Sequence, residues 1–214
     1  MERIICLLIG YAFGLLQTGY VVGKINHIDI RKEGSGNAGS TNAVRVMGWK
    51  AGGLTFAGDV LKCMAAIFIA RYLYRDSDFL PLLSMYAGMG ATLGHNFPFY
   101  LRFKGGKGIA VLAGLVLSTG LVMVPIPLAA FLISVAFTRY VSLGSLLASS
   151  LFFLEILIFG ELGGFHIAAA YRYELYILVL LLTILAWYRH KENIKRLLAG
   201  TENTFGSGRK KAAE

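Results

Sequence analysis

Charged residues are scarce in this sequence. They account for 15% of its 214 residues, whereas 56% are hydrophobic, and the mean hydropathy is +0.62. Soluble domains are typically only about 45–50% apolar. The composition therefore excludes an ordinary soluble domain and indicates an integral membrane protein of one domain.

Metal ligands and catalytic signatures are also sparse. The two cysteines, Cys6 and Cys63, fall in apolar runs, where a disulfide is not expected. The four histidines, at positions 27, 95, 166 and 190, have no Cys or acidic partners at ligand spacing. No serine stands in a G-x-S-x-G nucleophile elbow. We therefore expect no metal site and no cofactor.

Acidic residues are fewer than basic ones, which leaves a formal net charge of +9. No basic soluble module of the kind that binds nucleic acid accompanies this charge. In membrane proteins, lysines and arginines gather in cytoplasmic loops beside anionic headgroups. The charge thus indicates the lipid bilayer as the partner and excludes nucleic acid.

Seven apolar runs are long enough to cross, or nearly cross, about 30 Å of hydrocarbon. They lie at about 4–23, 51–72, 79–101, 108–123, 125–141, 142–160 and 174–190. The first starts like a signal peptide but has no convincing cleavage site, so we expect it to be retained. At VMVPIP, two prolines either turn a tight hairpin or kink one long helix. The sequence predicts an all-α polytopic membrane bundle of about seven transmembrane helices.

The charge distribution orients this bundle. With seven spans and the N-terminus outside, most of the 21 lysines and arginines fall in inside segments, as the positive-inside rule requires. An even number of spans would place the basic C-terminal tail on the wrong face. We therefore expect the N-terminus outside and the C-terminus in the cytoplasm. The polar segments 24–50, 101–108 and 189–214 then share the cytoplasmic side and could form one site.

Small and charged residues also occur within the spans. Two GxxxG motifs, at 10–14 and 90–94, have the spacing that lets helices approach closely. Asp59 and Lys62 are three residues apart on one helical face, and an intramembrane pair should face the bundle interior. The sequence leaves open whether this pair is a structural salt bridge or part of a site.

GSGNAGSTNAVRV lies in the first polar segment. Its glycines, including Gly34 and Gly36, permit a backbone whose N–H groups form a nest for an anion, and the Arg45 fork suits phosphate. The stretch resembles a nucleotide P-loop but has Ser40 in place of the lysine and no preceding strand, which disfavours an NTPase. A flexible connector is the alternative, although it would not need the arginine. The candidate phosphate-binding side chains are Ser35, Asn37 and Asn42.

FKGGKG closes the second polar segment, just before a helix. Gly105, Gly106 and Gly108 alternate with Lys104 and Lys107. A glycine-rich turn that leads into a helix N-terminus is a phosphate site. An ordinary positive-inside loop would need the lysines but not three glycines.

HKENIKRLLAGTEN, in the third polar segment, continues the last span as a short amphipathic helix. His190 and Asn193 share one helical face near the membrane surface, although an exposed polar helix end would look the same. Glu202 is as consistent with a structural anchor for the loops as with a member of the site. Two residues at the inner ends of spans, His95 and Ser142, are weaker candidates for substrate contact.

These three stretches resemble the motifs of a known family. GSGNAGSTNAVRVMG, FKGGKG after GHNFP, and HKENIKRLLAGTEN are similar to the cytoplasmic motifs of the bacterial acyl-phosphate:glycerol-3-phosphate acyltransferases, the Y-type membrane enzymes of phospholipid synthesis. The resemblance implies transfer of a fatty acyl group from acyl phosphate to the 1-hydroxyl of glycerol 3-phosphate, which gives 1-acylglycerol 3-phosphate and inorganic phosphate. The H-x-x-x-x-D signature of soluble-type and peripheral glycerolipid acyltransferases is absent, since Asp29 follows His27 by only two residues.

The motifs and the resemblance together define the expected site. The expected catalytic residues are Ser35, Arg45, Lys104, His190 and Asn193. The expected substrate-binding and phosphate-binding residues are Gly34, Gly36, Asn37, Asn42, Gly105, Gly106, Lys107, Gly108 and Ser142. Glu202 is expected to be structural.

The implied chemistry needs little covalent help, because phosphate is a good leaving group. Positioning two anionic substrates and neutralising their repulsion would be the main task. The attacking hydroxyl must lose a proton to His190 or to a phosphate oxygen of a substrate, and we favour the substrate. The acyl chain would lie among the apolar spans and enter laterally from the inner leaflet.

Two other functions fit less well. A transporter of a phosphorylated or organic anion tends to have a midplane site and repeated halves, and no internal repeat is evident. A non-catalytic adaptor would tolerate alanine at the loop glycines. We expect residues 1–202 to form one transmembrane catalytic domain in the inner (plasma) membrane and 203–214 to form a mobile cytoplasmic tail. The enzyme that makes acyl phosphate is an expected partner.

Overall fold

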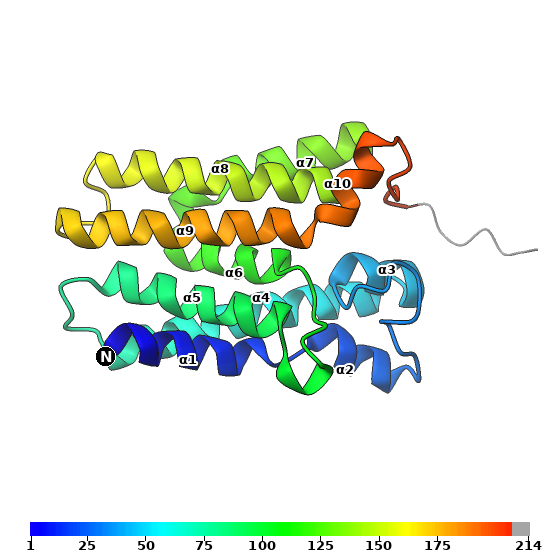
Figure 1. Ribbon diagram of the computed structural model, residues 1–214, viewed down its shortest axis with the longest axis horizontal. Helices are drawn as coiled ribbons and strands as arrows, with labels where there is room; N and C mark the ends of the chain where they lie inside the picture. Colours follow the sequence, from blue (N-terminus) through cyan, green and yellow to red (C-terminus); the bar gives the residue numbers. More distant parts are fainter. Residues whose placement is uncertain (207–214) are drawn as a thin grey trace, which may run out of the picture.

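The computed structural model describes residues 1–206, and every regular element within them is a helix, as predicted (Figure 1). Helices occupy all seven apolar runs: α1 Glu2–Gly14 with α2 Thr18–Ile25, α4 Trp49–Leu73, α5 Leu80–Asn96, α6 Ile109–Thr119, α7 Pro125–Thr138, α8 Val141–Glu161 and α9 Ala169–Arg189. Two short helices, α3 Ser40–Met47 and α10 Lys191–Leu198, and two 3-10 turns, η1 Phe99–Leu101 and η2 Leu121–Met123, complete the fold.

Five segments are long and apolar enough to cross a membrane. They are residues 2–25, 49–73, 121–138, 141–161 and 169–189. Helix α5 has 17 residues and α6 has 11, fewer than the roughly 20 of a full crossing. The chain is therefore a helical membrane protein with several spans, and a total of seven requires α5 and α6 to cross as well.

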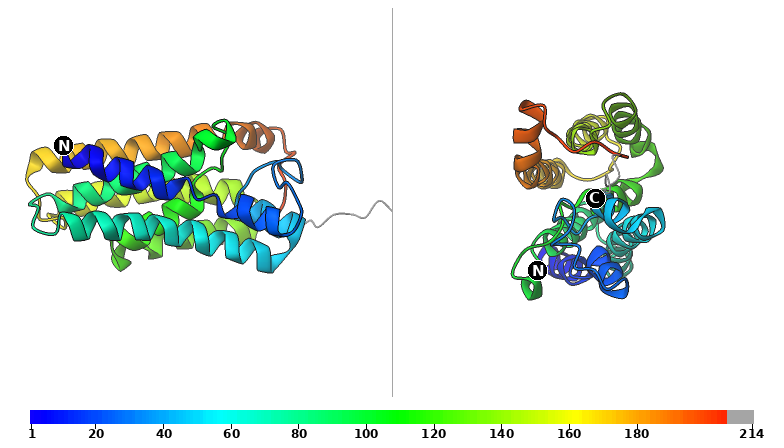
Figure 2. Two further views of the ribbon diagram at one scale, coloured as in Figure 1. Left: turned by 90° about the horizontal axis from the view of Figure 1, so that it is seen from below. Right: turned by 90° about the vertical axis from the view of Figure 1, so that its right-hand side faces the viewer.

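The helices form two groups (Figure 2). Helices α1, α2, α4 and α5 pack together on one side, and α8 packs between α7 and α9 on the other, while α6 contacts α4, α5 and α8. The N-terminus lies at one end of the bundle, and α3 and α10 lie at the opposite end. The three polar segments are thereby collected at one end.

The two prolines of VMVPIP begin a helix and do not kink one. Pro125 occupies the first turn of α7, where the missing N–H is not needed. The start of α6 and the end of α7 line the same cavity, so the chain reverses direction between them. Of the two alternatives left by the sequence, the turn between two helices is confirmed, although the hairpin is not tight, since α6 packs mainly on α4 and α7 packs mainly on α8.

The two GxxxG motifs face each other across the contact between α1 and α5. A Cβ added at Gly10 or Gly14 would collide with backbone atoms of α5. A Cβ added at Gly90 or Gly94 would collide with backbone atoms of α1. The expected packing role is confirmed, and the two backbones touch directly.

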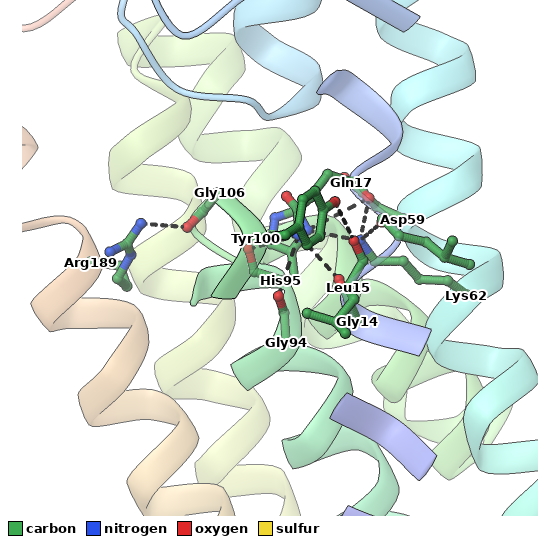
Figure 3. A network of polar contacts seen from close by, with 11 residues as sticks. Gly14, Leu15, Gln17, Asp59, Lys62, Gly94, His95, Tyr100, Gly106 and Arg189 are labelled. Atoms are coloured by element: carbon green, nitrogen blue, oxygen red, sulfur yellow. Dashed lines mark hydrogen bonds and ion pairs between the residues drawn. The ribbon is translucent and has the colours of Figure 1, made fainter. Parts of the chain in front are cut away.

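The first apolar run is not one continuous helix, because it breaks between α1 and α2 at residues 15–17 (Figure 3). Side chains from other segments satisfy the carbonyls that the break frees. Lys62 Nζ donates to the Leu16 carbonyl at 2.6 Å, and the Tyr100 hydroxyl donates to the Leu15 carbonyl at 2.7 Å. The break is therefore held by partners on α4 and η1.

The Asp59–Lys62 pair belongs to this brace. Lys62 Nζ also donates to Asp59 Oδ1 at 2.7 Å and to His95 Nδ1 at 2.9 Å, so its three protons have three acceptors. Gln17 Nε2 donates to the His95 carbonyl at 3.1 Å. The side chains of this brace, those of Gln17, Asp59, Lys62 and His95, are all buried. The pair is thus a buried structural brace, although Asp59 and His95 also line the cavity described next.

Candidate active site

A cavity of about 490 Å³ opens at the end of the bundle that carries α3 and α10. All three polar segments contribute to its wall. The expected site residues that line it are Ser35, Asn37, Asn42, Arg45, Lys107, Gly108, Ser142, His190, Asn193 and Glu202. The expected site residues that do not line it are Gly34, Gly36, Lys104, Gly105 and Gly106.

The first polar segment is a loop fixed by Asn42. Gly34 and Gly36 adopt φ values of +59° and +71°, which favour glycine. The buried Asn42 side chain accepts from the Ser35 N–H at 2.9 Å and donates to two carbonyls of the same loop at 3.1 and 3.0 Å. Asn42 therefore positions Ser35 at the cavity, and its amide is occupied by the loop.

The first residues of two helices line the cavity. Helix α3 starts after Gly39, and α6 starts after Gly108, whose φ is +84°. The first N–H groups of a helix have no partner within the helix and carry the positive end of its dipole. Arg45 from α3 lies in the same wall. The cavity is therefore suited to more than one anionic group.

Lys107, and not Lys104, is the lysine of FKGGKG that enters the cavity. Lys107 is partly buried and its Nζ donates to Asn193 Oδ1. Burial lowers the pKa of Lys107 to about 8. Lys104 is exposed, because the chain turns at Arg102 and Phe103, which both have positive φ. The sequence predicts Lys104 at the catalytic site, whereas the structure places it outside the cavity wall.

Gly105 and Gly106 hold the loop and do not face the cavity. Their N–H groups donate to the carbonyls of Asn96 at 3.2 Å and His95 at 3.1 Å. Their carbonyls accept from Arg189 Nη2 at 2.9 and 2.8 Å. A Cβ at Gly106 would collide with the imidazole of His95. These glycines let the loop lie against α5 and α9. The sequence predicts instead that they contact a phosphate group.

His190 is a buried, neutral imidazole in the cavity wall. Its Nδ1 lies 2.7 Å from the Ala186 carbonyl, which can only accept, so Nδ1 carries the proton and Nε2 is left as an acceptor. Burial, reinforced by the charge of Lys107, lowers the pKa of His190 to about 4. His190 is therefore a poor proton acceptor near neutral pH.

Glu202 links α8 and α10 beside the cavity. Its Oε1 accepts from Ser142 Oγ at 3.1 Å and from Asn193 Nδ2 at 2.7 Å, and its Oε2 accepts from Arg196 Nε at 2.9 Å. Asn193 in turn accepts from Lys107. Glu202 thus orients Asn193, and through it Lys107.

Residues just after Glu202 lie against the cavity. The Phe205 N–H donates to the Arg139 carbonyl at 2.7 Å, and the Phe205 ring packs edge-on against Trp49 with centroids 5.4 Å apart. Asn203 and Phe205 line the cavity. The sequence predicts a mobile tail over 203–214. Within it, Phe205 makes the contacts just given, Asn203 and Gly206 are exposed, and 207–214 lie outside the described residues.

One wall of the cavity is apolar. It includes Phe56 on α4 together with Phe131, Leu132 and Val135 on α7. Phe56 and Leu132 are about half exposed on the side of the bundle, at 47% and 55%. The cavity therefore continues from polar loops towards the lateral surface, a shape that suits a molecule with an anionic head and an apolar chain.

The chain is similar to known proteins over almost its whole length. A family model described as glycerol-3-phosphate acyltransferase matches residues 4–200. Glycerol-3-phosphate acyltransferases of Thermoanaerobacter pseudethanolicus and Shouchella clausii are 40% and 43% identical to this chain, and each alignment covers 96% of this chain and 97% of the relative. The crystal structure of PlsY (YgiH), an integral membrane glycerol 3-phosphate acyltransferase in its glycerol 3-phosphate form, superposes with a TM-score of 0.82 at 32% identity and covers 97% of both chains. A lysophosphatidic acid form of PlsY matches with a TM-score of 0.80.

Proposed function

Because the chain belongs to the glycerol-3-phosphate acyltransferase family and is an integral membrane enzyme of that class, we propose that its acyl donor is acyl phosphate. The 1-hydroxyl oxygen of glycerol 3-phosphate attacks the acyl carbonyl carbon, the bond from that carbon to the phosphate oxygen breaks, and inorganic phosphate leaves. The product is 1-acylglycerol 3-phosphate. The observation that carries this proposal is a single cavity with two helix N-termini, Arg45 and Lys107 at its polar end and an apolar wall beside them.

The side chains take separate roles in this reaction. Arg45 and Lys107 neutralise the two phosphate groups, and Ser35 with the loop around Asn37 supplies neutral donors. Asn193 orients Lys107, and Ser142 and Glu202 hold Asn193. Lys104 has no role at the reacting atoms, because it lies outside the cavity wall.

A substrate phosphate oxygen takes the proton of the attacking hydroxyl. His190 is the alternative base that the sequence offers, and its pKa of about 4 makes it a weak base at neutral pH. Its Nε2 instead accepts a hydrogen bond from a substrate hydroxyl and orients it. Proximity of the two bound substrates then supplies most of the acceleration.

The proposed membrane arrangement follows the charge. Seven spans, an outside N-terminus and a cytoplasmic cavity place the lysine- and arginine-rich segments on the inner side of the inner membrane. Residues 1–202 form the catalytic domain. Acyl phosphate is an amphipathic intermediate, so the enzyme that makes it is the proposed partner on the same membrane face.

The donor assignment is tested with purified protein, long-chain acyl phosphate and labelled glycerol 3-phosphate. We expect equal amounts of 1-acylglycerol 3-phosphate and inorganic phosphate. The same protein with acyl-CoA of matched chain length should give no product. Turnover with acyl-CoA but not with acyl phosphate would overturn the donor assignment while leaving the family assignment intact.

The pH dependence of kcat/KM should show a fall above about pH 8. Lys107 is charged below its pKa of about 8 and loses its charge as the pH rises through that value. Since kcat/KM reports the free enzyme, bound phosphate does not obscure this titration. Lys107→Arg should keep its charge and shift the alkaline fall upwards, while any acid-side change from the phosphate near pH 6 stays the same in both proteins. An unshifted alkaline fall in Lys107→Arg would assign the titration to another group.

A further inference from the structure

A second cavity, of about 330 Å³, lies at the opposite end of the bundle from the catalytic cavity. It is formed where α4 and α6 end and where α5 begins, and it is closed by Phe159 on α8 and by Gly164 and Phe165 after it. Most of its wall is apolar. None of its lining residues lines the catalytic cavity, so the two sites are separate.

Arg71 is the one charged residue in the wall of this cavity. The half-buried guanidinium donates from Nε to Ser84 Oγ at 3.0 Å and from Nη2 to the Ser118 carbonyl at 2.6 Å. Both acceptors are neutral. Within residues 1–206, no carboxylate lies within ion-pair distance of Arg71. The N–H donors of Arg71 are thus partly satisfied, whereas the charge of its guanidinium is not neutralised.

The other arginines at this end differ from Arg71 in this respect. Arg3 pairs with Glu174 at 2.6 Å, and Arg172 lies 3.6 Å from Glu161. Arg75, four residues after Arg71, lies 3.6 Å from Asp76. A guanidinium withdrawn from water without a counter-charge is costly, and in membrane proteins such a group pairs with an anion. Arg71 is therefore the arginine at this end that requires an anion from outside the chain.

The surroundings of the cavity identify the anion. A guanidinium fork matches phosphate, and Arg71 still has Nη1 to offer beyond its two protein contacts. The rim is apolar and faces outward, since Val122 is 65% exposed and the adjacent Leu121 is 78% exposed. Acyl chains can lie along such a rim, whereas a free phosphate ion gains nothing from it. We propose that this cavity binds the phosphate group of a membrane phospholipid through Arg71, as a lipid site distinct from the catalytic cavity.

The test uses the full chain purified in a maltoside detergent, which carries no phosphate. Thermal unfolding is followed by labelling of the buried thiols of Cys6 and Cys63. Saturating phosphatidylglycerol should raise the melting temperature of the wild type by on the order of 5 °C. Arg71→Gln should lose this shift, and Arg75→Gln, which removes a neighbouring arginine at the same end, should retain it.

Two further arms separate the sources of the anion. A galactolipid with the same acyl chains but no phosphate should give no shift, and inorganic phosphate alone should give little. A full shift with inorganic phosphate would mean that the cavity binds a free anion and not a lipid. A full shift with galactolipid would overturn the phosphate contact altogether. If Arg71→Gln does not fold, the wild-type comparison of the two lipids and the shift of Arg71→Lys decide the question, since lysine keeps the charge but loses the fork. Equal phosphatidylglycerol shifts in Arg71→Lys and wild type would contradict the role of the guanidinium. None of these readouts depends on acyl transfer.

Discussion

Replacing Lys107 by methionine is expected to lower kcat/KM for glycerol 3-phosphate by about 10²- to 10³-fold, whereas Lys104→Met should change it by no more than about twofold. The two lysines are three residues apart in the same glycine-rich stretch. Only Lys107 lines the cavity, where it contacts Asn193. Methionine preserves the unbranched apolar stem and removes the charge, so the difference between the variants measures the charge at the cavity.

Initial rates at varied glycerol 3-phosphate, with acyl phosphate held saturating, provide the measurement. Both variants should melt within a few degrees of the wild type, because neither substitution empties the hydrophobic core. A large loss in Lys104→Met with near-normal rates in Lys107→Met would reverse the assignment. Equal large losses in both would mean that the loop moves during turnover and brings Lys104 to the substrates.

Replacing Lys62 by methionine should lower the free energy of unfolding by about 3–5 kcal/mol, the typical cost of removing one partner of a buried ion pair. The substitution leaves Asp59 charged and buried, and it removes the donor to the Leu16 carbonyl in the break between α1 and α2. Because the penalty comes largely from the uncompensated carboxylate, the double variant Asp59→Asn with Lys62→Met should be more stable than Lys62→Met alone.

Unfolding can be followed through the native thiols. Cys6 and Cys63 are both 0% exposed, so a thiol-reactive fluorophore reports opening of the core on heating. Lys50→Met is the matched control, since Lys50 is an exposed lysine on the same helix. If Lys62→Met and Lys50→Met melt together, the brace does not stabilise the fold as described.

Hydropathy and spacing were enough to predict the helical segments and one of their contacts. A run of apolar residues has few alternatives to a helix in hydrocarbon, so all seven runs became helices. The GxxxG motifs at 10–14 and 90–94 also predicted a close contact between helices, since glycine at that spacing leaves a flat helix surface. The convergence of the three polar segments followed from the positive-inside rule.

The break at 15–17 could not be read from local sequence. It contains neither glycine nor proline, and its main partner, Lys62, is 46 residues away from Leu16 along the chain. The spacing of Asp59 and Lys62 did predict a buried polar pair. Which backbone groups it would satisfy depended on how α4 packs against the first two helices.

The choice between Lys104 and Lys107 depended on loop conformation. Arg102 and Phe103 adopt φ values of +53° and +59°, a region that non-glycine residues rarely occupy and that no pattern in FKGGKG predicts. The position of Phe205 in the cavity wall was also missed, because nothing in the residues after Asn203 resembled the three motifs. An aromatic residue in that polar stretch was the only signal available.

The broken first span has a consequence for biosynthesis. In hydrocarbon, each carbonyl without a donor costs several kcal/mol, and the donors for this break come from α4 and from the turn after α5. When residues 2–25 leave the ribosome, those donors have not yet been translated. The segment contains an 18-residue stretch with a mean hydropathy of 1.8, which is apolar enough to insert as an unbroken helix. It can adopt its final bent form only after the chain has been extended past Tyr100, so this span, although translated before α4 and α5, cannot reach its mature conformation before them.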